Sequence, residues 1–244
     1  RLACLSDEDT SYERNGYWKS SYKELKDKID RADAVSFDIF DTLIMRKIFS
    51  PEDVFRLLGE KVRAELKLDC EIAGIRAQAA AKCGSNATIN EIYKQIKKLT
   101  LQNTNIADIM QLEKDIDIDL CIARRDIADL YEYCLACGKK VYLISDMYYK
   151  LQDIKHLLDK CGVTIPDDEH IWISCEKKCD KVSGSIWKEY SELVGKDIKC
   201  LHIGDNKTGD VENPAKYGID SYYIMSAKDM LMNSSMAELA SHVN

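Results

Sequence analysis

The chain has 244 residues, 45% of them hydrophobic and 32% charged, a composition that suits one soluble domain or a core domain with a smaller one. Its formal net charge of −7 argues against a general nucleic-acid-binding surface. No apolar run approaches the ~20 residues that cross a bilayer, and no signal-peptide pattern opens the chain, so we expect a cytoplasmic protein without membrane insertion.

The ten cysteines do not predict a disulfide framework. A chain of this length can bury a core without covalent staples, so reduced thiols are expected. Cys134 and Cys137 form a CxxC on a helical pattern, which favours core packing over a redox or zinc site. Cys175 and Cys179 lack a second ligand pair at zinc spacing.

Residues 1–32 are expected to form an N-terminal arm followed by a helix, because three apolar residues recur there at helical spacing. These residues are Tyr22, Leu25 and Ile29. The apolar run Ala34–Phe37 then predicts a short buried strand that ends at Asp38.

Residues 49–121 carry helical patterns and are expected to form an all-α cap over the strand ends of a sheet. Thr88 and Glu91 fit a capping box at the start of one of these helices. The stretch "DIDIDL" at 115–120 alternates in polarity, which also fits a strand and leaves its structure ambiguous.

Residues 33–48 and 122–244 are expected to form the core domain. Strand patterns alternate there with helical ones, which predicts an α/β, three-layer, doubly wound fold with a mainly parallel sheet. The further strands are predicted at 140–144, 170–174, 198–204 and 221–225, and the helices at about 125–137, 150–160, 184–194 and 211–217.

Polar residues follow the predicted strands, at the strand ends where open α/β sheets bind ligands. In chain order they are Asp38, Asp41, Thr42, Ser145, Asp146, Lys181, Asp205 and Asp210. Several carboxylates around one point repel one another unless a cation joins them, and oxygen-only ligands suit Mg²⁺. With a lysine and backbone amides, Mg²⁺ would hold a phosphoryl group and offset the charge that grows on it.

Four strings resemble, in order and context, the motifs of the haloacid dehalogenase-like (HAD) superfamily, whose members are mainly phosphatases. The strings are "FDIFDTL", "VYLISD", "KVSGSIW" and "GDNKTGD". The resemblance covers about residues 33–226, and the helical insertion is similar to the cap that follows the first motif in one subgroup. The strings "FDIFDTL" and "SDMY" also resemble a bacterial subgroup found with surface-polysaccharide glycosyltransferases.

This resemblance implies a role for each matching residue. Asp38 would be the nucleophile that forms an aspartyl-phosphate. Mg²⁺ would be held by Asp38, the backbone carbonyl of Phe40 and Asp205. Asp210 would complete the acidic site, positioning Lys181 or a metal-bound water.

The remaining matches would bind the substrate. Lys181 would neutralise the charge of the nucleophile and the phosphoryl group. Ser145, with Asp146 beside it, would bind a phosphoryl oxygen, and Thr42 would steady the first loop. For Ser145 and Asp146 a simple strand-to-helix cap is the alternative, and Lys177 or Lys178 is the alternative to Lys181.

The chain departs from the family at Phe40, where the phosphatases usually have an Asp that acts as general acid and base. Such assistance is typically worth ~10²–10⁴-fold in rate, so turnover would be slow unless another group compensates. Asp41 and Asp146 are the candidates. His202 lies inside an apolar strand and is expected to be a buried, hydrogen-bonded histidine rather than a ligand.

The sequence therefore predicts Mg²⁺-dependent hydrolysis or transfer of a phosphoryl group on a small phosphorylated metabolite, for example a sugar phosphate. The first alternative is a non-catalytic domain that binds phosphate and Mg²⁺ and is accessory to a fused or associated glycosyltransferase or another enzyme. The second is a metal-free haloacid dehalogenase, because those enzymes carry an aromatic residue at the position of Phe40.

Overall fold

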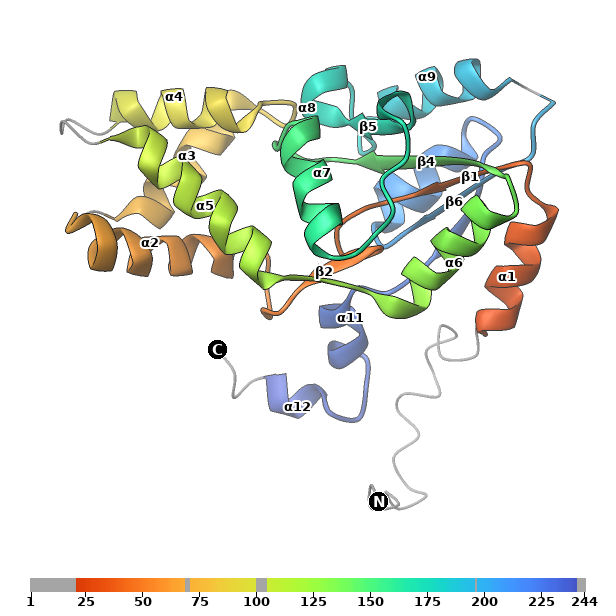
Figure 1. The fold of residues 1–244 in the computed structure, drawn as a ribbon, viewed down its shortest axis with the longest axis horizontal. Helices are drawn as coiled ribbons and strands as arrows, with labels where there is room; N and C mark the ends of the chain where they lie inside the picture. Colours follow the sequence, from red (N-terminus) through yellow and green to blue (C-terminus); the bar gives the residue numbers. More distant parts are fainter. Residues whose placement is uncertain (1–20, 69–70, 100–104, 196, 241–244) are drawn as a thin grey trace.

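A computed structural model of the protein describes residues 21–68, 71–99, 105–195 and 197–240. The first part of the expected N-terminal arm, residues 1–20, lies outside these ranges. The core is a sheet of five parallel strands in the order β5-β4-β1-β6-β7 (Figure 1), which confirms the predicted fold class. The strands are β1 (Ala34–Phe37), β4 (Lys140–Ser145), β5 (Ile171–Ile173), β6 (Cys200–Gly204) and β7 (Asp220–Tyr223).

Helices cover both faces of this sheet. The main core helices are α1 (Tyr22–Arg31), α6 (Arg125–Ala136), α7 (Leu151–Lys160) and α9 (Ser185–Val194). Alternate strand residues point to opposite faces, so Val35 and Phe37 of β1 pack in one apolar cluster with α1, α6 and α7, whereas Ala34 packs with α9. Shorter elements are η3 (Asp168–His170), α8 (Ser174–Lys177), η4 (Lys207–Glu212), α10 (Asn213–Ala215), α11 (Ala227–Met232) and α12 (Ala237–Ala240).

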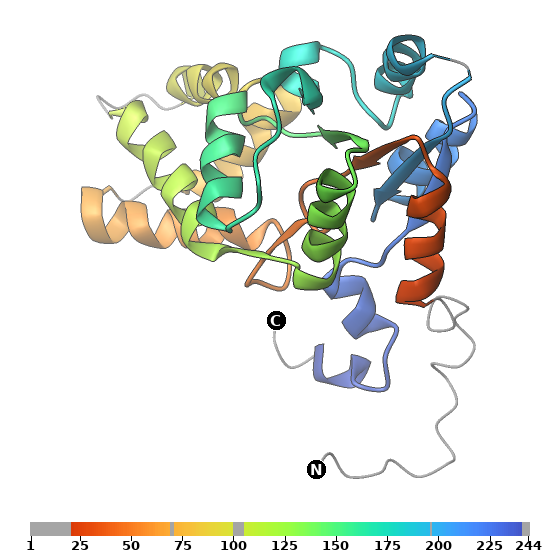
Figure 2. The ribbon, with the colours of Figure 1, turned by 45° about the vertical axis from the view of Figure 1, so that its right-hand side comes forward.

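Four helices form the insertion, and Figures 1 and 2 both show them gathered at one end of the molecule. They are α2 (Asp53–Leu66), α3 (Ile72–Cys83), α4 (Ile89–Leu99) and α5 (Ile106–Leu120). Thr88 and Glu91 form the predicted capping box, with the Thr88 backbone N–H 2.8 Å from a Glu91 carboxylate oxygen. The ambiguous segment 115–120 is the last part of α5, because burial of Ile109, Glu113 and Ile116 follows helical spacing.

Two short strands that the sequence did not predict join the insertion to the core. They are β2 (Ile44–Arg46) and β3 (Cys121–Ala123), which pair antiparallel with Ile44 opposite Ala123. The two chain crossings between core and cap therefore lie side by side. Within the described residues, no helix is both long and apolar enough to span a membrane.

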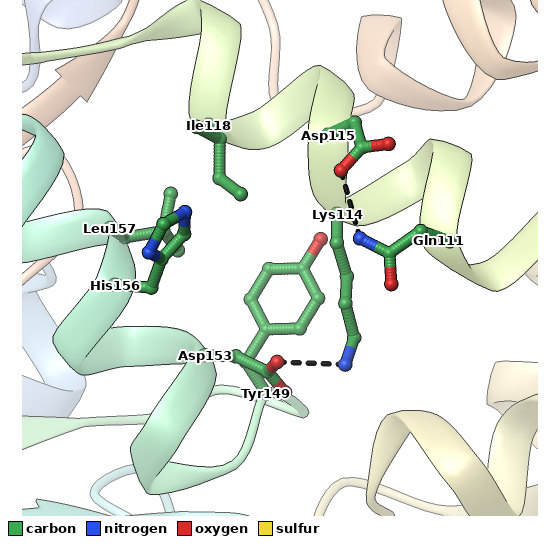
Figure 3. A pocket seen from close by; sticks show the side chains of 8 residues that line it. All are labelled: Gln111, Lys114, Asp115, Ile118, Tyr149, Asp153, His156 and Leu157. Atoms are coloured by element: carbon green, nitrogen blue, oxygen red, sulfur yellow. Dashed lines mark hydrogen bonds and ion pairs between the residues drawn. The ribbon is translucent and has the colours of Figure 1, made fainter.

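The loop after β4 fastens the cap to the core. The Tyr148 ring lies 4.6 Å from the guanidinium carbon of Arg76 inside the cap. The Tyr149 hydroxyl donates to Asp117 of α5 at 2.7 Å, and Asp117 also binds Arg46 of β2. Figure 3 shows the neighbouring seam between α5 and α7, where Lys114 and Asp153 form an ion pair of 2.7 Å. Polar contacts from three elements thus hold this side of the cap against the core.

The cysteines of the described residues are all free thiols. Cys134 is buried in the core and Cys137 is exposed at the end of α6, so only the first of this pair packs as expected. Cys175 and Cys179 are both buried. Cys4 and Cys70 lie outside the described residues. Within the described part of the chain, no group of His, Cys, Asp and Glu side chains suited to a metal includes a cysteine.

Candidate active site

Three carboxylates meet beyond the carboxyl ends of the central strand, β1, and its neighbour β6. Asp38 follows β1, Asp205 follows β6, and Asp210 lies in the π-helical turn η4. One oxygen from each lies within 4.8 Å of the others. Asp38 and Asp210 are buried and Asp205 is half-buried. We call these three residues the acid trio.

Lys181 reaches into the acid trio from the loop that follows α8. Its Nζ atom lies 2.6 Å from Asp38 Oδ1 and 2.7 Å from Asp210 Oδ1. The alternatives point elsewhere: Lys178 binds the carbonyl of Asn86 in the cap, and Lys177 lies over the Trp172 ring. Lys181 is therefore the lysine that the fold brings to the acids.

The backbone of Lys181 is held from two sides. Its N–H donates to both carboxylate oxygens of Asp146 at 3.0 Å. Its carbonyl accepts from the Asn213 side chain at 2.9 Å. The structure thus places Asp146 next to the lysine backbone, where its two oxygens already accept hydrogen bonds.

The acid trio carries more negative charge than Lys181 balances. Burial raises the pKa of Asp38 well above its ordinary value, although Lys181 acts in the opposite direction. Burial, followed by the charge of Asp210, raises the pKa of Asp205 to about 7. Burial alone would also raise the pKa of Asp210, but Lys181 and His202 together lower it below its usual range. One cation for three carboxylates leaves a site that favours a further cation.

A buried chain of hydrogen bonds orients Asp210. His202 Nε2 lies 3.0 Å from Asp210 Oδ1, and His202 Nδ1 lies 2.8 Å from the Ser36 hydroxyl. Burial lowers the pKa of His202, so the ring is neutral. Because a carboxylate only accepts, Nε2 carries the proton and donates to Asp210, and Ser36 donates to Nδ1. This confirms that His202 is a buried, hydrogen-bonded histidine.

Sequence reasoning missed Ser36, which the register of the sheet places directly opposite His202. The available signal was a polar residue in the middle of the apolar run of β1.

Gly204, at the end of β6, makes room for Asp210. A Cβ atom at this position would lie 2.4 Å from the carboxyl carbon of Asp210. Asp210 has little freedom to move away, because it is also bound by Lys181, His202 and the backbone N–H of Asn206 at 2.9 Å. The glycine of the "GDNKTGD" string therefore has a steric role in the site.

Phe40 and Asp41 are neighbours in the loop that follows β1. The Phe40 ring lies 4.4 Å from the guanidinium carbon of Arg46, so it packs against the cap linker. Asp41 has a φ of 59°, the left-handed conformation that Asp tolerates better than most residues. Burial raises the pKa of its carboxyl group, an effect that Arg46 and Arg124 oppose.

The two hydroxyl groups expected near the phosphoryl group are both buried. Ser145 is the last residue of β4 and is 2% exposed, and Thr42 is fully buried. The Thr42 hydroxyl has no hydrogen-bond partner within the described residues. No side-chain hydrogen bond from Thr42 therefore steadies the loop in this structure.

A cavity of about 280 Å³ adjoins the acid trio. Asp205 and Asp41 line it from the core, Arg46 and Phe49 from the linker into the cap, and the start of α11 from the far side. We call it the side pocket. A small molecule bound there would lie next to Asp205.

The acid trio fits a bound Mg²⁺ ion. Its donors are carboxylate oxygens only, the ligand type that Mg²⁺ prefers, and the excess negative charge would be offset by a divalent ion. The family resemblance also implies the backbone carbonyl of Phe40, on the same loop as Asp38, as a fourth protein donor. The charge of Asp210 adds to the effect of burial in raising the pKa of Asp205 to about 7.

No protein-family model matches the sequence, and no curated protein is similar to it. Solved structures do resemble the fold. A HAD family enzyme from Bacteroides thetaiotaomicron has a TM-score of 0.55 at 18% identity, over 82% of this chain and 97% of that one. YfnB of Bacillus subtilis, described as a HAD-hydrolase and bound to magnesium, has a TM-score of 0.53 at 14% identity, over 82% of this chain and 97% of that one.

A 2-haloacid dehalogenase from Pseudomonas syringae is also similar. Its TM-score is 0.52 at 12% identity, over 79% of this chain and 86% of that one. The chain therefore has the HAD fold with a helical cap. Because the similar structures include a dehalogenase as well as a magnesium-bound protein, the fold alone does not select the reaction.

Proposed function

We propose that the chain is a Mg²⁺-dependent hydrolase of small phosphate monoesters that works through an aspartyl-phosphate on Asp38. The observation that carries this proposal is the meeting of Asp38, Lys181 and the other two carboxylates of the acid trio at the strand ends. The Bacteroides enzyme of the same fold has been solved in complex with magnesium and inorganic phosphate, with a TM-score of 0.51 and 18% identity.

Each residue of the site has a task in this reaction. The acid trio and the Phe40 carbonyl would hold Mg²⁺, which when bound supplies charge stabilisation for the phosphoryl oxygens. Lys181 favours the ionised form of Asp38 that attacks phosphorus, and it offsets the charge that builds on the phosphoryl group. The hydroxyls of Ser145 and Thr42 would donate to phosphoryl oxygens, and the Thr42 hydroxyl has no other hydrogen-bond partner within the described residues.

Asp41 is a better candidate than Asp146 for the missing general acid. Both oxygens of Asp146 accept the backbone N–H of Lys181, so this side chain supports the lysine rather than the substrate. Asp41 lines the side pocket together with Asp205. Its raised pKa favours the protonated form that a leaving alkoxide needs. After that transfer, the Asp41 carboxylate would accept a proton from the water that attacks the aspartyl-phosphate.

The first alternative is a non-catalytic domain that binds phosphate and Mg²⁺. The packing of Phe40 on Arg46 favours it, because the position of the usual acid is occupied by a ring engaged in holding the cap. Association with a glycosyltransferase rests on the strings "FDIFDTL" and "SDMY" and would make a sugar phosphate the natural substrate. A metal-free dehalogenase has less support, because it gives no task to Asp205.

The proposal is tested by measuring phosphate release from a panel of phosphorylated metabolites, with Mg²⁺ and with a chelator, for the wild type and Asp38→Asn. We expect Mg²⁺-dependent release that Asp38→Asn abolishes while the melting temperature stays within a few degrees. The panel should include an aryl phosphate, whose leaving group needs little protonation. Release that persists in Asp38→Asn would refute the proposed nucleophile. Binding of phosphate and Mg²⁺ without release from any ester would favour the non-catalytic domain.

A further inference from the structure

The side pocket is where a substrate's leaving group would lie if the proposed function holds. It shares Asp205 with the acid trio, and one oxygen of Asp205 lies within 4.8 Å of an oxygen of Asp38. Its other walls are Phe49 of the linker and Lys228 and Asp229 of α11. An ester whose phosphoryl group sits on Asp38 would therefore have this cavity within reach of its alcohol portion.

The opposite side of the cap offers less room. Tyr148 and Tyr149 of the core bind Arg76 and Asp117 of the cap there. At the next point along the seam, Asn86 of the cap donates to Asp180 at 3.1 Å. A smaller cavity of about 160 Å³ remains on this seam between α5 and α7, but no residue of the acid trio lines it (Figure 3). The side pocket lies instead between the linker into the cap and α11.

One carboxylate of the side pocket has no cationic partner. Arg46 is already paired with the buried carboxylate of Asp117, Asp205 belongs to the acid trio, and Asp41 is protonated in the proposed reaction. The charges that are left are those of Asp229 and Lys228. The Asp229 carboxylate takes part in no ion pair within the described residues, whereas the Lys228 Nζ lies 5.2 Å from the centre of the Phe49 ring. The pocket therefore favours hydrogen-bond donors and repels a second anion.

We propose that the side pocket binds the alcohol portion of the phosphate monoester and selects a small alcohol that carries hydroxyl or ammonium groups and no second anionic group. This inference rests on the proposed function. The volume of about 280 Å³ lies just below the ~300–1,000 Å³ that ligand pockets typically span, so the alcohol has few carbons. Asp229 and Lys228 determine its charge preference, and neither has been assigned a role in the chemistry.

Glycerol 3-phosphate and 3-phosphoglycerate form a matched pair for the test, because they share a three-carbon skeleton and differ in a terminal hydroxymethyl or carboxylate group. Binding is measured by calorimetry with Mg²⁺ on Asp38→Asn, so that no turnover is needed. We expect glycerol 3-phosphate to bind at least ~10-fold more tightly, a difference of about 1.4 kcal/mol. Equal binding, or tighter binding of 3-phosphoglycerate, would overturn the proposal.

Variants of the side pocket then test which residues cause the preference for glycerol 3-phosphate. Asp229→Asn should narrow the ratio of the two dissociation constants at least threefold, whereas Asp159→Asn, the same charge change on exposed α7, should leave it unchanged. A ratio that responds equally to both variants would show a general charge effect and would contradict the proposed site. Ala227→Trp, which fills the pocket, should weaken binding of glycerol 3-phosphate at least tenfold and leave inorganic phosphate binding unchanged. Unchanged binding of the ester in Ala227→Trp would place the alcohol elsewhere.

Inorganic phosphate and beryllofluoride distinguish a failure of the proposed function from a failure of the side pocket as the leaving-group site. Both probe the phosphoryl site of the wild type without an alcohol portion. If neither binds with Mg²⁺, the proposed function fails and this inference falls with it. If both bind while the two esters show no difference, the proposed function stands and the side pocket is not the leaving-group site.

Discussion

The cap and the core both bury charged side chains, but they balance them differently. In the cap, Arg76 and Glu113 form a pair with two bonds of 2.8 Å, and their side chains are 1% and 0% exposed. The Tyr93 hydroxyl binds the same carboxylate at 2.6 Å. In the core, Lys181 forms ion pairs with Asp38 and Asp210, and its single charge faces the three carboxylates of the acid trio. A balanced, fully bonded pair has a structural role, whereas an excess of one sign is a site for a ligand of the other sign.

The largest effect is expected from breaking the balanced pair. Glu113→Leu leaves the Arg76 guanidinium buried without a carboxylate partner and should lower the free energy of unfolding by about 3–5 kcal/mol. The double variant Arg76→Met, Glu113→Leu removes both charges and should recover most of this loss. Urea denaturation measures both. A double variant as unstable as the single one would show that packing, and not the charge balance, holds the cap together.

The next effect concerns the rate of the proposed reaction. Asp41→Asn and Asp41→Gly both tolerate the left-handed backbone and both remove the carboxyl group. Each should lower kcat for an alkyl phosphate about 10²-fold or more and lower it much less for an aryl phosphate. Asp146→Asn is the comparison. If it removes alkyl phosphatase activity and Asp41→Asn does not, Asp146 is the replacement acid.

Gly204→Ala should disturb the acid trio without touching a charge. The new Cβ would overlap the Asp210 carboxyl group, so we expect a loss of about 1–3 kcal/mol in stability and a loss of the Mg²⁺-induced rise in melting temperature. Gly74→Ala is the control, because its Cβ would meet its nearest neighbour at 3.7 Å on an exposed helix face. This control should gain up to about 1 kcal/mol. Unimpaired Mg²⁺ binding in Gly204→Ala would contradict the fixed position of Asp210.

A smaller effect is expected at the far end of the hydrogen-bond chain behind Asp210. Ser36→Ala removes the donor to His202 Nδ1 and should cost about 1 kcal/mol of stability. His202→Phe keeps a ring beside Trp187 but removes the donor to Asp210, and it should weaken Mg²⁺ binding more than Ser36→Ala does. Calorimetric titration with Mg²⁺ compares the two. Unchanged Mg²⁺ binding in His202→Phe would mean that the histidine acts only through packing.

Asp205→Asn tests the acid trio, because its effect on the free energy of unfolding should change sign when Mg²⁺ is added. Without Mg²⁺ it should raise the free energy of unfolding by about 1 kcal/mol, because it removes one of three repelling carboxylates. With Mg²⁺ it should be less stable than the wild type, because a ligand is lost. Destabilisation in both conditions would mean that the acid trio has no excess charge to relieve.

The same two regions differ in how far the sequence predicts them. The residues of the acid trio could be brought together from the sequence, because the carboxyl ends of parallel strands meet at one edge whatever the details of packing. Lys181 was one of three lysines near that edge, and the choice depended on backbone bonds from Asp146 and Asn213 that no spacing shows.

The cap needed information that a local pattern does not contain. Strands β2 and β3 have three residues each and pair across the whole insertion, so neither has a recognisable period of its own. Tertiary packing of α5 makes the alternating segment 115–120 helical. The contact between Tyr148 and Arg76 joins residues that are far apart in the chain, and the local sequence around either residue does not predict it.

The most direct test of the central claim is fluorine NMR of beryllofluoride, a mimic of the aspartyl-phosphate, added to the protein with Mg²⁺. The wild type should show a bound signal that a chelator removes, because the fluoride complex attaches to Asp38 in the presence of the metal. Asp38→Asn, with an unchanged fold, should show none. A bound signal of equal strength in Asp38→Asn, or one that does not depend on Mg²⁺, would contradict the assignment of the acid trio as a phosphoryl-transfer site.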